Sequence, residues 1–120
     1  MASLSSLLVA FMALLHVYIL VLEMFLWTTP HGLKAFGLKP DIAEKTKILA
    51  ANQGLYNGFL AAGLFWGLVH PVPEFATQIE LFFLGLVGAA GIYGGLTAMP
   101  KIFFIQSVPA AIAGLAVYLG

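Results

Sequence analysis

The sequence contains no cysteine and no arginine, and only 8% of its 120 residues are charged. Without cysteine the chain has no disulfide, no thiolate metal ligand and no thiol nucleophile. Without arginine it lacks the side chain that binds phosphates and carboxylates through two parallel hydrogen bonds. Its five lysines are balanced by five acidic residues, so it has no basic surface for DNA or RNA. Soluble domains carry roughly 25% charged residues, so this chain is too poor in charge for a water-soluble surface.

Hydrophobic residues make up 62% of the chain, and the mean hydropathy is +1.02. The length allows one domain, which we expect to cover 1–120. A membrane helix needs roughly 20 mostly apolar residues to cross a hydrocarbon core of about 30 Å. Proline and charged residues separate four such runs, which predict helices over about 4–28, 41–69, 79–98 and 102–119. The predicted fold is an all-α membrane protein, a four-transmembrane-helix bundle.

The lysines predict the orientation of this bundle. Lys34, Lys39, Lys45 and Lys47 flank the first connection, and Lys101 lies in the third. Because loops rich in lysine stay in the cytoplasm, we expect the first and third connections there and both termini outside.

Polar side chains recur at one predicted depth in the membrane. Counted from the cytoplasmic helix ends at about 1.5 Å per residue, five of them lie roughly 6 to 9 Å deep. They are Glu23, Asn52, Gln53, Tyr93 and Gln106. His16 is two turns from Glu23 on the same face, about 10 Å deeper, and Tyr56 and Asn57 lie at intermediate depths. This pattern predicts one polar cavity toward the cytoplasmic side.

Glu23 and His16 are the candidate groups for proton transfer. A lone carboxylate in hydrocarbon takes up a proton more readily than it stays charged, so Glu23 can carry protons. In the structural alternative, Glu23 lies near the headgroups and accepts hydrogen bonds from Trp27 or the lysines. His16 is either a catalytic group or a neutral imidazole bonded to a neighbouring helix.

The run Ala51-Asn52-Gln53-Gly54-Leu55-Tyr56-Asn57-Gly58 places amide side chains and a phenol along one side of a helix, with Gly54 and Gly58 at GxxxG spacing. Such groups orient a water or a substrate oxygen but do not strongly activate it. We therefore predict substrate binding by Asn52, Gln53, Tyr56, Asn57, Gln106 and Trp27. The alternative is that these side chains only join helices.

Two further features concern packing. Gly85, Gly88, Gly91, Gly94 and Gly95 predict a smooth face for close helix approach. Pro109 cannot donate a hydrogen bond to the carbonyl of Ile105, which predicts a kink just past Gln106.

No metal and no cofactor are predicted. His16 and Glu23 alone do not make a metal site, and His31 and His70 lie in opposite loops. The chain has no phosphate-binding glycine loop with its lysine. The absence of arginine also argues against glutathione as a cofactor.

The motifs from His16 to Trp27, from Ala51 to Leu64 and from Ala90 to Gly94, with Gln106 and Pro109, resemble the domain-of-unknown-function 1304 family over essentially the whole chain. The family consists of small bacterial inner-membrane proteins with four predicted helices, so the resemblance implies a multi-pass protein of that membrane. It implies no activity. The predicted polar positions coincide with the family's motif residues.

Three functions are compatible with these residues. The first is an intramembrane enzyme that performs acid/base chemistry, an isomerisation, hydration or hydrolysis, on an apolar or amphipathic small molecule. Glu23 would be the base and His16 or Tyr93 the acid. The second is a small proton-coupled exporter that works as a homodimer. The third is an accessory subunit in which the polar layer only locks the helices. We favour the enzyme, with membrane lipid and a small ligand as partners and a homo-oligomer as the assembly.

Overall fold

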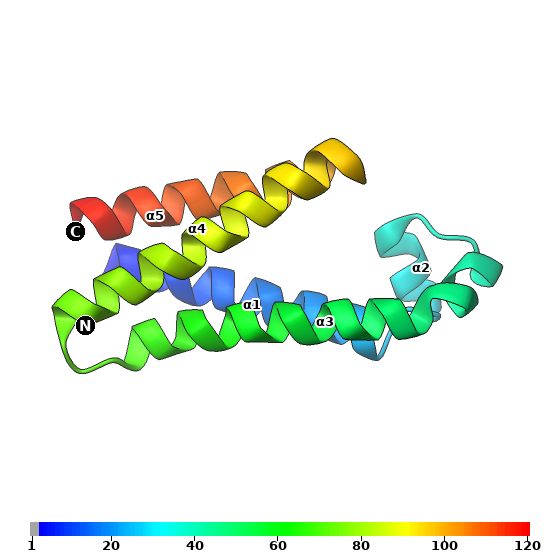
Figure 1. Cartoon of the computed structure of the whole chain (residues 1–120), viewed down its shortest axis with the longest axis horizontal. Coiled ribbons are helices and arrows are strands. Elements are labelled where there is room, and N and C mark those ends of the chain that lie inside the picture. Colours follow the sequence, from blue (N-terminus) through cyan, green and yellow to red (C-terminus); the bar gives the residue numbers. More distant parts are fainter. Residues whose placement is uncertain (1–2) are drawn as a thin grey trace. The chain divides into compact units, whose positions relative to one another are not determined.

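The computed structural model describes residues 3–120, which form five α-helices and one π-helical turn. In chain order these are α1 (Leu4–Met24), α2 (Pro30–Phe36), α3 (Pro40–Val69), α4 (Pro73–Thr97), the π-helical turn η1 (Phe103–Ser107) and α5 (Val108–Leu119) (Figure 1). The described residues contain no strand, so the all-α prediction is confirmed.

The first helix is shorter than predicted, and a separate helix follows it. The predicted helix 4–28 ends at Met24, and α2 begins six residues later. Thr29 caps α2: its hydroxyl accepts a hydrogen bond from the Gly32 amide at 3.3 Å and donates to the Leu26 carbonyl at 2.7 Å. Pro30 occupies the first helical position, where no intrahelical donor is needed. Thr29 and Pro30 therefore begin a helix, and α1 ends before them.

Gly37 ends α2 with a left-handed backbone, φ 64° and ψ 38°. The amides of Gly37 and Leu38 both bond to the Leu33 carbonyl. A Cβ at Gly37 would meet nothing within 4 Å, so only the backbone conformation opposes a side chain there.

Replacing Gly37 with alanine is therefore expected to lower the free energy of unfolding by about 1 to 2 kcal/mol, the cost of a left-handed residue with a Cβ. Gly37→Asn should cost less, because asparagine tolerates this conformation. Thermal unfolding in detergent measures both variants. An alanine variant as stable as wild type would show that the α2 end is not held in this conformation.

The third predicted helix also begins at a different residue. The sequence predicts it from about residue 79, but α4 begins at Pro73, with Glu74 in its first turn. Pro73 fits the first turn of a helix, and Glu74 interacts favourably with the partial positive charge there. Glu80 consequently lies inside the helix and not at its start.

Where the sequence predicts a kink just past Gln106, the chain forms a π-helical turn. In η1 the Val108 amide bonds to the Phe103 carbonyl, five residues earlier. Pro109 follows and has no amide hydrogen to donate to the preceding turn, which favours this wider spacing.

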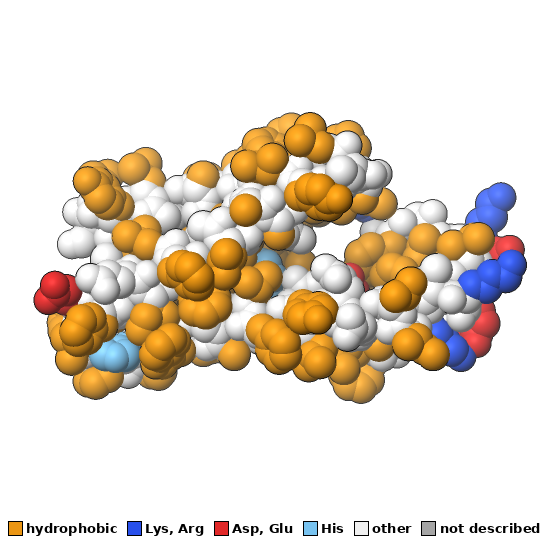
Figure 2. Space-filling model, in the orientation of Figure 1, with side chains coloured by type: hydrophobic (Ala, Val, Ile, Leu, Met, Phe, Trp, Pro, Cys, Tyr) orange, Lys and Arg blue, Asp and Glu red, His pale blue; other side chains and the backbone are white. Residues whose placement is uncertain are grey.

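Within residues 3–120, two helices are long and apolar enough to cross a membrane, α1 and α4. A third apolar stretch, Phe103–Leu119, is shorter. α3 is long, but its first turns carry charged residues. Figure 2 shows these charged side chains gathered over α2 and the start of α3, whereas apolar side chains cover much of the remaining visible face.

The chain folds as two compact units, and the boundary between them cuts through α1 and α3. Unit 1 contains the residues up to Ala13 together with Leu60–Gly120, and unit 2 contains Leu14–Phe59. The completely buried side chains of unit 1 include Val9, Met12, Leu64 and Val87. Those of unit 2 include His16 and Ala43.

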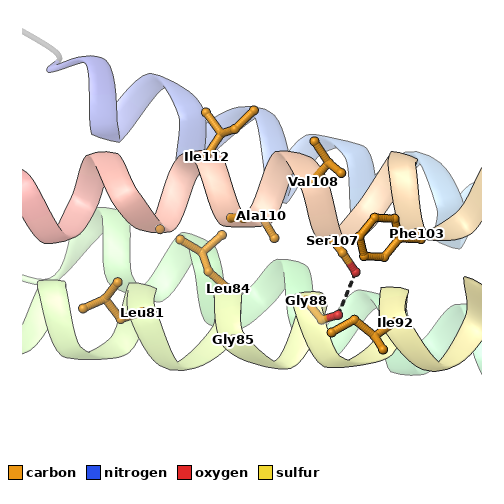
Figure 3. Close-up of a pocket in the computed structure, with 12 residues that line it drawn as sticks. Leu81, Leu84, Gly85, Gly88, Ile92, Phe103, Ser107, Val108, Ala110 and Ile112 are labelled. Carbon is orange, nitrogen blue, oxygen red and sulfur yellow. Dashed lines mark hydrogen bonds between the residues drawn. The ribbon is translucent and has the colours of Figure 1, made fainter.

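In unit 1, α4 runs beside η1 and α5 (Figure 1). The Ser107 hydroxyl donates to the Gly88 carbonyl at 2.7 Å, as the dashed line in Figure 3 shows. The glycine face predicted on this helix divides into two groups. Gly91, Gly94 and Gly95 lie against Ser107, Ile102 and Phe103, whereas Gly85 and Gly88 have nothing within 4 Å of an added Cβ.

Candidate functional site

The centre of the candidate site is a hydrogen-bonded pair in unit 2. Asn57 on α3 donates its side-chain amide to Glu23 Oε1 on α1 at 2.6 Å. The same amide group also donates to the Gln53 carbonyl one turn earlier, at 3.2 Å. Glu23 and Asn57 are each only 8% exposed. The amide therefore fixes one oxygen of a buried carboxyl group.

Glycines on α3 allow this pair to form. A Cβ on Gly54 would lie 2.7 Å from Met24 Cγ, 3.1 Å from Glu23 Cβ and 3.2 Å from the Leu20 carbonyl oxygen. A Cβ on Gly58 would lie 2.7 Å from Leu20 Cδ1. Real Cβ atoms do not come as close as 2.7 Å, and contacts of 3.1 and 3.2 Å are unusually tight. The GxxxG spacing thus marks the face of α3 that approaches the last two turns of α1.

His16 lies on α1 in the same unit and is completely buried. Seven residues separate it from Glu23, which corresponds to about 10 Å along a helix. The two side chains therefore do not bond directly. A substrate or a chain of waters would have to connect them if both took part in one proton transfer.

Trp27 has a structural partner. Its indole amine donates to the Thr46 hydroxyl on α3 at 3.1 Å, and Thr46 in turn donates to the Ile42 carbonyl at 2.7 Å. The ring of Trp27 also packs on Phe36 of α2, with centroids 4.7 Å apart. The donor that we predicted to contact a substrate thus holds together α3 and the segment after α1.

The other predicted residues of α3 do not share the burial of Asn57. The side chains of Asn52, Gln53 and Tyr56 are exposed, and Tyr56 packs edge to face against Phe59. The structure brings together Glu23, Asn57 and the Gln53 carbonyl, but it does not bring Asn52 or Tyr56 to them. Their role in substrate binding stays a prediction.

Tyr93 and Gln106 belong to unit 1. Tyr93 is 72% exposed, and its carbonyl accepts a hydrogen bond from the Thr97 hydroxyl at 2.7 Å. Gln106 lies in η1 and is half-buried. A shared polar layer of these residues with Glu23 stays a prediction.

One contact of unit 2 was not predicted. The Tyr18 hydroxyl and His31 Nε2 are 2.8 Å apart and join α1 to α2. The sequence predicts His31 in a loop, because the predicted helices leave residues 29–40 outside them. The helix-start signal of Thr29 and Pro30 could have identified it.

The arrangement has limited chemical options. Among residues 3–120, no three His, Asp or Glu side chains are grouped to hold a metal ion. Glu23 can accept a proton and return it, and Asn57 can orient its carboxyl group but cannot transfer a proton. The pair is therefore suited to general acid/base chemistry or to binding a hydrogen-bond donor.

A separate groove of about 540 Å³ lies in unit 1 between α4 and the η1–α5 segment. Leu81, Leu84, Phe103, Val108 and Ile112 contribute to its lining, and Ser107 adds a hydroxyl (Figure 3). None of the predicted site residues lines it. Its apolar character distinguishes it from the predicted polar cavity.

Comparisons with known proteins cover most of the chain. A family model described as "Protein of unknown function (DUF1304)" matches residues 10–118. The uncharacterized protein YpaA of Lactococcus lactis subsp. lactis (strain IL1403) is 29% identical over 100 residues, which cover 80% of this chain and 81% of YpaA. No solved structure matches the chain. The family match includes every residue of the candidate site.

Proposed function

Since this chain belongs to the DUF1304 family, whose description gives no activity, we propose its function from the Glu23–Asn57 pair. We propose a multi-pass protein of the bacterial inner membrane that performs acid/base chemistry on a small apolar or amphipathic molecule. The pair that carries this proposal is buried, and its hydrogen bond uses only one of the two carboxyl oxygens of Glu23.

The membrane placement is supported by composition and exposure. α1 and α4 are long and apolar enough to span a bilayer, and large apolar side chains are exposed on every long helix. Leu14, Leu49, Leu96 and Leu115 are examples, from α1, α3, α4 and α5. A lipid environment would cover such side chains without cost. In the proposed bundle α3 and residues 103–119 are the other two spans, and both termini lie outside.

In the proposed chemistry Glu23 accepts a proton from the substrate and returns it at another position, so that an isomerisation needs no further reactant. Asn57 holds the carboxyl group in one orientation during both transfers. His16, deeper along α1, would bind or protonate the far end of the substrate. Tyr93 stays a candidate acid and Gln106 a candidate binding residue of this proposal, both in unit 1.

A bound molecule is the first expectation of this proposal. Wild-type protein, extracted in mild detergent and analysed by native mass spectrometry, should carry a discrete small molecule in addition to lipid. Turnover of that molecule would support an enzyme, whereas its unchanged release coupled to proton uptake would support the exporter. Wild-type protein that carries lipid alone would contradict the site and favour an accessory subunit.

A further inference from the structure

A second buried carboxyl group lies in unit 1. The predicted helix over 79–98 has Glu80 at its start, but α4 begins at Pro73, so Glu80 lies about 10 Å along the helix from its first residue. The side chain is only 9% exposed. Residues 3–120 provide it with no hydrogen-bond or ion-pair partner.

Near the end of α3, a glycine leaves room for the Glu80 side chain. A Cβ on Gly67 would lie 2.5 Å from Glu80 Cγ and 3.4 Å from the Glu80 backbone nitrogen. Gly63, one turn earlier on α3, lies in the same way against the ring of Phe83, one turn later on α4. The two glycines allow close approach of the helices, and Glu80 occupies the space that a larger residue at 67 would fill.

The charged and titratable groups of the surrounding elements do not neutralise Glu80. Glu74, on the same helix, is exposed and has the same charge sign. The His70 ring, just past the end of α3, accepts a hydrogen bond from the Val72 amide at 3.1 Å and packs against Trp66 and Phe75. The part of α1 in unit 1 contributes no titratable side chain, and Tyr118 of α5 is exposed.

We propose that Glu80 is a proton-binding site inside the α3–α4 hairpin, separate from Glu23. A buried carboxylate with no partner is strongly unfavourable, and a bound proton on one carboxyl oxygen removes that charge. The site would hold a neutral carboxylic acid in apolar surroundings. This inference does not depend on the chemistry proposed for Glu23.

Carbodiimides test this state directly, because they react with protonated carboxylic acids. The acid proton moves to a carbodiimide nitrogen and the carboxyl oxygen bonds to the central carbon. The acyl group then shifts from that oxygen to nitrogen, so the side chain gains the whole reagent and nothing leaves. Dicyclohexylcarbodiimide partitions into apolar regions, whereas a carbodiimide carrying a charged amine stays in water.

The full-length protein in lipid vesicles is treated with each reagent and mapped by peptide mass spectrometry. Dicyclohexylcarbodiimide should give roughly tenfold more adduct on Glu80 than on Glu74. The free-energy cost of burying an unpaired charge is larger than the free energy that corresponds to a tenfold difference in the protonated fraction. The charged reagent should leave Glu80 unmodified. Glu80→Gln should remove the adduct assigned to Glu80. If that variant does not fold, the comparison of Glu80 with Glu74 in the wild-type protein still tests the proposal.

Three results would overturn the proposal. They are an unmodified Glu80, equal adducts on Glu80 and Glu74, or equal modification of Glu80 by the two reagents. Each would show that the carboxyl group is ionised or open to water. None of them bears on the Glu23 site, so the two proposals fail separately.

Discussion

Glu23→Gln is expected to weaken binding of the co-purifying molecule roughly tenfold to a hundredfold while leaving the protein folded. Hydrogen bonds that involve a charged group contribute about 1.5 to 3 kcal/mol, which corresponds to that range of affinity. Glutamine keeps a carbonyl oxygen that can accept the Asn57 amide hydrogen, so the buried donor at 2.6 Å in the wild type retains a partner. Proton transfer by the carboxyl group is lost completely.

Glu44→Gln is the matched control for this variant. Glu44 is an exposed acid of α3 in the same unit, ion-paired with Lys47, and exposed ion pairs contribute little to stability. It should retain ligand and unfold at the wild-type temperature. If Glu23→Gln keeps the ligand, or if it fails to fold while Glu44→Gln folds, Glu23 is a structural residue.

Gly91→Ala is expected to lower the free energy of unfolding by about 1 to 3 kcal/mol or more, the usual cost of overpacking a tight helix contact. Its Cβ would lie 2.7 Å from the Ser107 amide nitrogen and 3.0 Å from Gln106 Cβ, and it would also meet the Ser107 hydroxyl. The backbone of η1 cannot move away without breaking the bond from Ser107 to the Gly88 carbonyl.

Gly88→Ala, one turn earlier on α4, gives the comparison. An added Cβ there meets nothing within 4 Å, and alanine is favoured over glycine in a helix by about 1 kcal/mol. Thermal unfolding in one detergent should rank Gly88→Ala at or above wild type and Gly91→Ala well below it. Equal effects would show that α4 does not pack closely on η1.

The sequence predicted the helices well and their ends poorly. A long apolar run predicts that a helix is present. The four predicted runs overlap α1, α3, α4, and η1 with α5. Their ends depend on single capping residues. Pro30 and Pro73 lie between the predicted helices, yet each occupies the first turn of the next helix. Proline ends one helix and begins another by the same lack of an amide hydrogen.

The site was predictable in part, because α3 has apolar residues on more than one face. A polar residue on such a helix can point to either side, so the sequence pattern predicts Asn52 and Tyr56 in the same cavity as Asn57. The buried positions Ala43, Ala50 and Asn57 recur at a spacing of seven, the period of a helix-packing seam. Asn57 continues a line of small buried residues, whereas Asn52 and Tyr56 do not. That spacing was visible in the sequence.

The Glu23–Asn57 pair is the central claim, and its geometry is measurable in a bilayer. Solid-state NMR on protein with ¹³C-labelled glutamate carboxyls and ¹⁵N-labelled asparagine amides, reconstituted in lipid vesicles, gives the separation of Asn57 Nδ2 from Glu23 Cδ. A hydrogen bond of 2.6 Å to Oε1 predicts roughly 3.5 Å for that separation, and Glu23→Gln identifies the signal by removing it. A separation beyond roughly 6 Å, which no hydrogen bond spans, would contradict the account.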